Sequence, residues 1–176
     1  MKLQCTHENL DKALSNISRA VANRTTLPIT QNVLLKVTNG KLQLSATNLE
    51  MAINTWIGAE ITEEGETTVP ARIFTDLIKS YPNDHIDLNL SNNNLAIKCG
   101  PYNSNLITQP SDDFPPIPES DSLDPTFTIS PARLSKLINS VIFSAAQDQS
   151  RPVLTGVKFS ITNNVLTLAS ADGFRL

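Results

Sequence analysis

The sequence is poor in cysteine, in aromatic residues and in long hydrophobic runs. Its 176 residues include 2 Cys, 6 Gly and only 5% aromatic residues. Cys5 and Cys99 have no neighbouring Cys or His, so neither a disulfide framework nor a zinc site is predicted, and we expect buried free thiols. No apolar run approaches the roughly 18 residues of a membrane span, and residues 1–6 do not resemble a secretion signal. We therefore expect a cytoplasmic protein that does not enter a membrane.

Motifs for catalysis and for phosphate binding are also missing. His7 and His85 have no Ser, Cys or Asp partner at a known spacing, and neither G-x-S-x-G nor H-E-x-x-H occurs. Gly100 and Gly156 stand alone and do not belong to a Gly-rich phosphate loop. The sequence therefore predicts no catalytic residue, no metal and no cofactor. A hydrolytic or small-ligand domain that uses His7 or His85 is the enzymatic alternative.

Hydrophobic periodicity predicts an α+β fold with antiparallel sheets. Leu10, Leu14 and Ile17 recur at helical spacing in the first predicted helix, where Thr6 and Glu8 are placed to cap and complement the start. Helices are predicted at 6–21, 71–80 and 131–145, and strands at 32–38, 41–46, 51–60, 67–69, 86–90, 95–98 and 102–108. A two-residue hairpin turn is predicted at Asn39-Gly40 because both residues tolerate positive φ.

The chain also repeats itself. A shift of 124 positions aligns residues 3–52 with 127–176 without a gap, and the order of helix, loop, strand, Asn turn and strand is reproduced. Residues 109–125, rich in Pro and acidic residues, are predicted to connect the two copies. We therefore expect a first domain over 1–125 and an incomplete second domain over 126–176. The second is expected to be poorly stable alone, because half a sheet leaves an unpaired edge and an open core.

Charge is divided unevenly along a chain whose formal net charge is −3. The predicted helices and Arg24 just beyond the first carry seven basic residues against three acidic ones, so the remainder is strongly acidic. The basic residues are Lys12, Arg19, Arg24, Arg72, Lys79, Arg133 and Lys136. Such helices suit sequence-independent contact with nucleic-acid phosphates, although basic residues on a polar helix face are often only solvated.

Five short segments carry a resemblance to a known family. They lie in chain order at 24–29 (RTTLPI), 46–50 (ATNLE), 68–72 (TVPAR), 113–115 (DFP) and 171–176 (ADGFRL). The combination resembles the bacterial DNA polymerase III beta subunits, the sliding clamps. The resemblance implies a DNA-clamp fold of repeated units, helices packed on antiparallel sheets, with three domains per subunit and a head-to-tail homodimeric ring around duplex DNA. The third domain is absent from these 176 residues.

The resemblance also implies which residues meet DNA and which meet proteins. For DNA it adds Arg24, at the end of the first pore helix, and Gln149, in a loop with a polar DNA-contacting residue. For short hydrophobic peptides of the replicative polymerase and the clamp-loader subunits, it implies a groove that includes Arg151, Leu154, Ala171, Gly173, Phe174, Arg175 and Leu176. Ala171 stands where the family often has Thr, and Phe174 where it often has His.

Two functions follow from this resemblance. The first is a non-catalytic processivity factor, a ring subunit that tethers the polymerase to DNA, with any ATP site on the loader. The alternative is a truncated relative that cannot form a ring and either binds clamp partners only or has no function.

Overall fold

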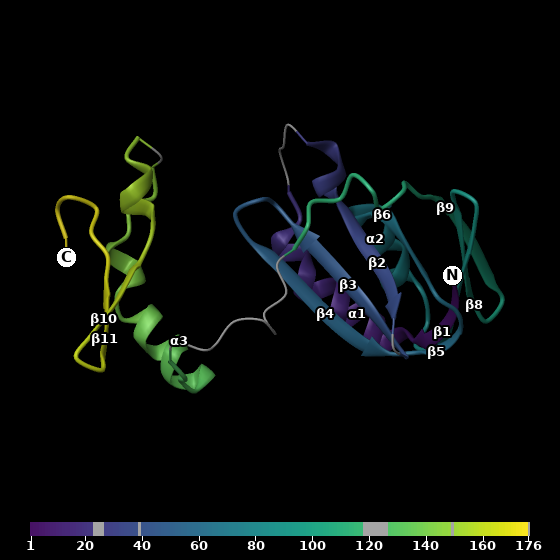
Figure 1. Ribbon diagram of the computed structural model, residues 1–176, viewed down its shortest axis with the longest axis horizontal. Helices are drawn as coiled ribbons and strands as arrows, with labels where there is room; N and C mark the ends of the chain where they lie inside the picture. Colours follow the sequence, from purple (N-terminus) through teal and green to yellow (C-terminus); the bar gives the residue numbers. More distant parts are fainter. Residues whose placement is uncertain (23–26, 39, 118–126, 149, 176) are drawn as a thin grey trace. The chain divides into compact units, whose positions relative to one another are not determined.

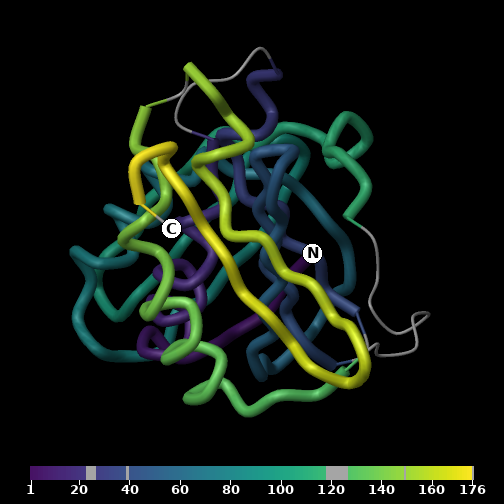
Figure 2. Tube along the Cα trace, turned by 90° about the vertical axis from the view of Figure 1, so that its left-hand side faces the viewer, coloured from purple at the N-terminus to yellow at the C-terminus, as the bar shows by residue number. Residues whose placement is uncertain are grey.

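The computed structural model describes residues 1–176 except 23–26, 39, 118–126, 149 and 176. The chain divides into two compact units, residues 1–119 and residues 120–176, which we call unit 1 and unit 2. Each unit is described by itself below (Figures 1 and 2).

Unit 1 contains two antiparallel sheets and two α-helices. A five-stranded sheet has the order β5-β1-β7-β8-β9, and a four-stranded sheet has the order β4-β3-β2-β6. The helix α1 lies behind the four-stranded sheet in Figure 1 and packs against α2. The elements are β1 (Lys2–Thr6), α1 (His7–Ile17), β2 (Asn32–Thr38), β3 (Lys41–Thr47), β4 (Ala52–Gly58), β5 (Glu60–Glu63), β6 (Gly65–Pro70), α2 (Ala71–Ser80), β7 (His85–Ser91), β8 (Asn94–Cys99) and β9 (Tyr102–Ile107).

Unit 1 is built from two halves that exchange their first strands. One half runs β1-α1-β2-β3-β4, and the other runs β6-α2-β7-β8-β9. The strand β1 pairs with β7 of the other half, and β6 pairs with β2. The registers match: Leu3 lies opposite Leu88, and Thr67, the equivalent of Leu3, lies opposite Leu35, the equivalent of Leu88. The two halves are therefore related by an approximate two-fold axis.

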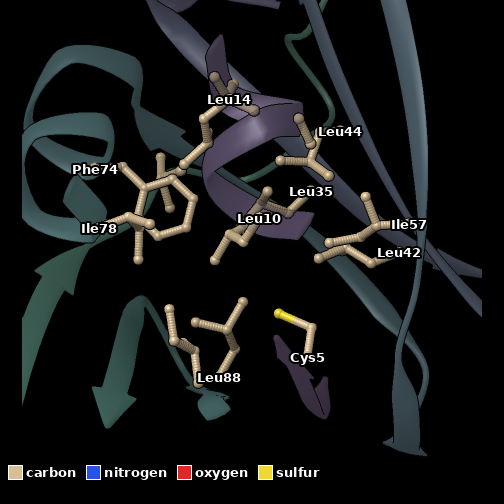
Figure 3. Packing of buried hydrophobic residues seen from close by; sticks show 14 of the residues in the cluster. Cys5, Leu10, Leu14, Leu35, Leu42, Leu44, Ile57, Phe74, Ile78 and Leu88 are labelled. Atoms are coloured by element: carbon tan, nitrogen blue, oxygen red, sulfur yellow. The ribbon is translucent and has the colours of Figure 1, made fainter. Parts of the chain in front are cut away.

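The core of unit 1 lies where both helices meet both sheets. Leu10 and Leu14 of α1 are fully buried, as are Phe74 and Ile78 of α2. Figure 3 shows these four side chains pointing toward one another. Leu88 of β7 faces them from the sheet on the other side of the core. Residues spaced by four lie on one face of a helix, so each helix turns a single apolar face inward and keeps its polar face exposed.

Unit 2 consists of one helix and one hairpin. These are α3 (Pro131–Asn139), β10 (Lys158–Thr162) and β11 (Val165–Ala169), with 3-10 turns at Ile142–Ser144 and Pro152–Thr155. They take the places of α1, β2, β3 and the 3-10 turn Pro28–Gln31 under the shift of 124 positions. None of the described hydrophobic residues of unit 2 is buried, whereas unit 1 has a full core.

The predicted helices and strands are present, with corrections at their ends. The first helix stops at Ile17, before a 3-10 turn at Ser18–Ala20, and the third stops at Asn139. At both ends a serine hydroxyl, Ser18 or Ser140, donates to a backbone carbonyl three residues earlier, which competes with continued helix. The expected side-chain cap from Thr6 is wrong, since its side chain makes no capping hydrogen bond.

Two strands, β1 and β5, were not expected from the pattern. Each is only four or five residues long, although polar and apolar residues alternate in both, which was a usable signal for a half-buried strand. The expectation of buried free cysteines is confirmed for Cys5 and Cys99. Gly40 has φ +75, as the predicted hairpin turn requires, but Asn39 lies outside the described residues. No described helix has the length and apolar character needed to cross a membrane.

Candidate nucleic-acid interface and peptide groove

The basic residues predicted on the helices of unit 1 all lie on exposed surface. Lys12 is on α1, Arg19 is on the 3-10 turn that follows, and Arg72 and Lys79 are on α2. Because α1 and α2 bury their apolar faces against each other and the sheets, these cations are left on the outward faces of two neighbouring helices. Their arrangement suits contact with phosphates, which demands positive charge but no base-reading pattern.

Lys12 differs from the other helix cations because it has an acidic partner. Its Nζ pairs with Glu8, one turn earlier on α1, and both side chains are well exposed. The hydrogen bond from Lys12, and then its charge, lower the pKa of the Glu8 carboxyl. In the described part of the chain, Arg19, Arg72 and Lys79 have no carboxylate within salt-bridge distance. Among the described helix cations of unit 1, these three residues therefore carry positive charge that no carboxylate offsets.

The helix α3 of unit 2 carries the remaining predicted cations. Arg133 and Lys136 are exposed, and within the described ranges neither pairs with a carboxylate. Lys136 occupies the position of Lys12 under the internal repeat, but the position of Glu8 is taken by Ala132. Arg24 and Gln149, the two DNA residues taken from the resemblance, lie outside the described residues.

The predicted groove residues of unit 2 meet around a carboxylate that the sequence did not single out. Asp172 Oδ1 accepts hydrogen bonds from the backbone N–H groups of Phe174, at 2.9 Å, and Arg175, at 2.8 Å. Its Oδ2 accepts from Arg175 Nε at 3.0 Å and pairs with the same guanidinium. The backbone donors, Phe174 first and then Arg175, hold the pKa of the Asp172 carboxyl below its ordinary value, and the Arg175 side chain adds to the effect.

Arg151 closes over the same loop. Its guanidinium donates to the backbone carbonyl of Asp172 at 3.5 Å and lies against Gly173. Gly173 has φ +92, a backbone conformation that favours glycine, whereas the guanidinium 3.2 Å from where a Cβ would lie is the flexible end of an exposed side chain and could shift. Arg151, Asp172, Gly173 and Arg175 therefore form one connected surface.

The apolar residues of the predicted groove differ in how far they are buried. Leu154 is half-buried, and its carbonyl accepts from Ala146 N–H at 2.9 Å, which fixes the 3-10 turn Pro152–Thr155. Ala171 is half-buried, whereas Phe174 is 95% exposed. Leu176 lies outside the described residues. The loop thus presents an exposed aromatic ring beside two cationic side chains.

His7, one of the two histidines of the enzymatic alternative, has a structural role in unit 1. His7 Nε2 lies 2.9 Å from the carbonyl oxygen of Ile78, so the ring joins α1 to α2. Among the described residues, no group of three or more His, Cys, Asp or Glu could hold a metal ion. The position of His7 is explained by helix packing alone.

Comparison with known proteins identifies the family of both units. Residues 1–118 match the model of the DNA polymerase III beta subunit, N-terminal domain, and residues 128–176 match that of the DNA polymerase III beta subunit, central domain. The beta sliding clamp of Proteus mirabilis is 37% identical over 178 residues, an alignment that covers 100% of this chain and 48% of that protein. The chain spans about half the length of the curated relatives it matches.

Solved structures agree with the sequence relatives. The DNA polymerase III subunit beta from Pseudomonas aeruginosa is 35% identical, with a TM-score of 0.90 over 98% of this chain and 47% of that one. A sliding clamp from the same organism bound to griselimycin is 36% identical, with a TM-score of 0.89 and the same coverage. The expected DNA-clamp fold is thus confirmed, and the chain belongs to the DNA polymerase III beta subunit family, of which it contains the N-terminal domain and part of the central domain.

Proposed function

We propose that the chain serves as part of a sliding clamp, a non-catalytic ring subunit that encircles duplex DNA and tethers the replicative polymerase. The observation that carries this proposal is the family match along the whole chain, which coincides with basic residues on exposed helix faces. The remainder of the ring would come from sequence corresponding to the other half of the relatives' length. The working compartment would be the cytoplasm, where bacterial DNA is replicated.

The proposed DNA contacts are electrostatic and independent of sequence. Lys12, Arg19, Arg72, Lys79, Arg133 and Lys136 supply exposed positive charge, and Arg24 and Gln149 are proposed to join them. Contacts of this kind release counterions and weaken steeply with salt, but they let a protein slide along the duplex. A closed ring needs no tight contact, because its topology prevents escape while weak contacts keep the DNA centred.

The proposed partner site is the loop surface of unit 2. Leu154, Ala171 and Leu176 would form its apolar floor, and Arg151, Gly173, Phe174 and Arg175 its rim. A short hydrophobic peptide from a polymerase or clamp-loader subunit would place its Leu or Phe side chains there, each contributing about 1.5–3 kcal/mol if fully buried. The loader, not this chain, would supply any ATP site.

The domain boundaries remain part of the proposal. We place the first clamp domain at 1–125 and the beginning of the second at 126–176, joined by the acidic, Pro-rich stretch 109–125. In this stretch the backbone of Gln109 pairs with Thr68 of β6, and Phe114 is buried. The first part of the connector therefore packs with unit 1, which supports a boundary beyond residue 114.

The proposed function is tested by the topology of the DNA. The protein would be incubated with clamp loader, ATP and nicked circular DNA, separated by gel filtration, and compared before and after linearisation. A ring subunit is retained on the circle and lost from the linear form, because it slides off the ends. Equal retention on both forms would contradict encirclement.

The alternative, a chain that binds partners without forming a ring, makes a different prediction. It binds a fluorescent hydrophobic peptide, with griselimycin as a competitor, yet it is not retained on circular DNA even with loader and ATP. An Arg151→Ala, Arg175→Ala double variant weakens the peptide signal, whereas Lys98→Ala, on the exposed face of β8, leaves it unchanged. Failure of both assays would remove both functions.

A further inference from the structure

In each half of unit 1, the chain ends beside the strand with which that half begins. After the first half, β4 leads into β5, which pairs with β1 through three pairs of residues. After the second half, β9 leads to Gln109, which pairs with Thr68 of β6 in a single bridge (Figure 1). Since Thr68 is the equivalent of Gln4 on β1, Gln109 takes the place that Glu60 of β5 has in the first half. The second half therefore ends with far less backbone pairing than the first.

Side chains of β2 and β6 hold Gln109 in place of a longer strand. The carbonyl oxygen of Gln109 accepts from the Thr68 N–H at 2.9 Å and from the hydroxyls of Thr68 and Thr67 at 3.1 and 3.2 Å. The N–H of Gln109 donates to the Thr68 carbonyl at 3.0 Å. Its side-chain Oε1 accepts from Asn32 Nδ2 at 2.9 Å, and Asn32 also donates to Thr68 Oγ1 at 3.1 Å. Five hydrogen bonds therefore attach one residue to the edge of the four-stranded sheet.

The two sides of this attachment differ in burial. Asn32, Thr67 and Thr68 are 6%, 3% and 0% exposed, whereas Gln109 is exposed. Buried polar groups need hydrogen-bond partners, and Gln109 supplies partners for all three. These groups lie at the outer edge of β6, an end strand of its sheet, so water can replace Gln109 once it moves away. Release of Gln109 therefore leaves no polar group without a partner.

The residues on either side of Gln109 are held at separate points. The N–H of Thr108 donates to a backbone carbonyl of the β7–β8 turn at 2.9 Å. The hydroxyl of Ser111 donates to a carboxylate of β6 at 2.7 Å, and the carbonyl of Ser111 accepts from the N–H of Phe114, whose side chain is 7% exposed. Residues 108–114 thus contact both sheets, but they form no strand with either.

We propose that residues 108–114 are a releasable strap, which opens as one unit while both sheets of unit 1 stay folded. Pro110 has no N–H, so the strap cannot extend its pairing with β6 beyond Gln109. Segments with few backbone hydrogen bonds open cooperatively at a free energy below that of global unfolding. Opening adds the length of the strap, roughly 25 Å when extended, to the connector that leads to unit 2. The proposal concerns unit 1 alone and does not depend on the ring function proposed above.

The backbone N–H of Thr68 reports on the strap from within the sheet. Thr68 is fully buried in β6, yet its N–H donates to Gln109 and not to β2. Alternate N–H groups along a paired strand face opposite sides, so the neighbouring N–H groups of Thr67 and Val69 face β2. If the strap opens by itself, the amide proton of Thr68 exchanges with water at the rate of the strap, whereas its neighbours keep the slower rate of the sheet.

Hydrogen exchange of the native 176-residue chain, followed by NMR, tests whether such an opening exists. We expect the amides of Thr68, Thr108 and Gln109 to exchange with one common opening constant, at least about tenfold larger than that of Leu88 in the core strand β7. Exchange of all four amides at one opening constant would mean that the strap opens only with the whole unit. Three unequal constants for the strap amides would mean that it does not open as one unit. Either result overturns the proposal.

Two variants separate the strap from the core. Gln109→Met removes only the Oε1 acceptor, and Asn32 keeps its bond to Thr68. Because this variant weakens the closed state itself, it should speed exchange of the strap amides and of Leu88 by the same factor, about threefold to tenfold. Ile17→Val, in the buried face of α1, is the matched control, which should speed Leu88 by a similar factor and leave the strap amides unchanged.

The control variant decides between local and global opening, because the core contact of Ile17 persists when only the strap opens. If Ile17→Val speeds the strap amides as much as Leu88, the strap has no opening of its own. If Gln109→Met leaves the strap amides unchanged, the side chain of Gln109 does not hold the strap. Both outcomes contradict the proposal.

A disulfide that fastens the strap provides the second test. Paired residues on antiparallel strands have Cα atoms about 5.5 Å apart, within the range of disulfides, so a Thr68→Cys, Gln109→Cys chain should form one on oxidation. The two native thiols are buried and do not compete. In the oxidised chain the amide of Thr108 should exchange as slowly as that of Leu88, and reduction should restore the faster exchange. A chain that does not oxidise, or one whose Thr108 exchange is the same in both forms, overturns the proposal.

Discussion

Asn48 and Asp172, 124 positions apart, make the same pair of hydrogen bonds in the two units. Asn48 Oδ1 accepts from the backbone N–H groups of Glu50 and Met51, at 3.1 and 2.8 Å, and Asp172 Oδ1 accepts from those of Phe174 and Arg175. The residue after each is left-handed, with φ +74 at Leu49 and φ +92 at Gly173. The loop that carries the proposed groove is therefore a repeated turn, held by one side-chain oxygen.

This turn predicts a difference between two substitutions at one position. Asp172→Asn keeps an Oδ1 acceptor, as Asn48 does in unit 1, and should weaken peptide binding by less than about threefold. Asp172→Ala leaves two backbone donors without their acceptor and should weaken it by about tenfold, because the loop must then be ordered on binding. Fluorescence anisotropy of a labelled hydrophobic peptide measures both. Equal losses would show that the charge of Asp172, and not the turn, matters; Asn48→Ala is the control in unit 1.

The Glu8–Lys12 pair predicts a gain in DNA binding. Glu8→Gln removes the carboxylate that holds Lys12, which then becomes available to a phosphate. We expect tighter binding to duplex DNA at low salt, with a slope of log affinity against log salt that steepens by about 0.9 for one added phosphate contact. Glu60→Gln is the control. It changes the net charge by the same amount as Glu8→Gln, but Glu60 is on the edge strand β5 and not on a helix.

Fluorescence-detected titrations at several salt concentrations separate the two cases. If Glu8→Gln and Glu60→Gln increase affinity equally, net charge alone acts and the helix faces have no special role. If neither does, Lys12 is not a phosphate contact. Only a larger effect of Glu8→Gln agrees with the proposed interface.

The sequence predicted correctly those helices whose bounds depend only on the local residue pattern. The helix α2 has the predicted bounds, because apolar residues at helical spacing, Ala71, Phe74 and Ile78, begin directly after Pro70. The internal repeat also indicated that 127–176 copies 3–52, since identical spacing survives when identity is low. Asp172 was missed as the organiser of the groove, although its counterpart Asn48 was a usable signal, because one Asx residue in a loop is common.

Properties that depend on two distant segments could not be predicted in this way. The exchange of β1 and β6 between the halves of unit 1 joins strands more than 25 residues apart, and no local pattern specifies a partner strand. For 127–176 the repeat already indicated an open core, but it did not show how far each hydrophobic residue is exposed. The ion pair between Glu8 and Lys12 could have been predicted from the sequence, because residues i and i+4 face each other on a helix.

The thiol of Cys5 predicts a loss of stability in alkali. Burial, and then the Asp87 carboxylate, raise the pKa of Cys5 from 9.0 to about 12, and burial also raises that of Cys99. The folded chain keeps these protons above pH 9, whereas the unfolded chain releases them. The stabilisation from Cys5 is therefore complete below pH 9 and declines as pH rises toward 12, by up to about 1.4 kcal/mol per pH unit.

Urea unfolding between pH 8 and 10.5 measures this decline. Trp56, the one tryptophan of the chain, lies on β4 and reports on unit 1. Cys5→Ala should be less stable than the unchanged chain at pH 8 but should lose less stability as pH rises. An identical pH dependence for both would mean that Cys5 titrates normally in the folded chain.

The last prediction compares two leucines in equivalent positions. Leu10 of α1 is fully buried against α2 and both sheets, whereas its counterpart Leu134 of α3 is only half-buried. Leu10→Ala removes a filled core position and should lower the free energy of unfolding of unit 1 by about 2–5 kcal/mol, measured from Trp56 fluorescence in urea. Leu134→Ala should shift that transition by less than about 0.5 kcal/mol, because its side chain lies in the other unit and leaves no closed cavity. An equal shift for both would mean that units 1 and 2 unfold as one cooperative structure, and a negligible shift for Leu10→Ala would mean that α1 does not hold the core together.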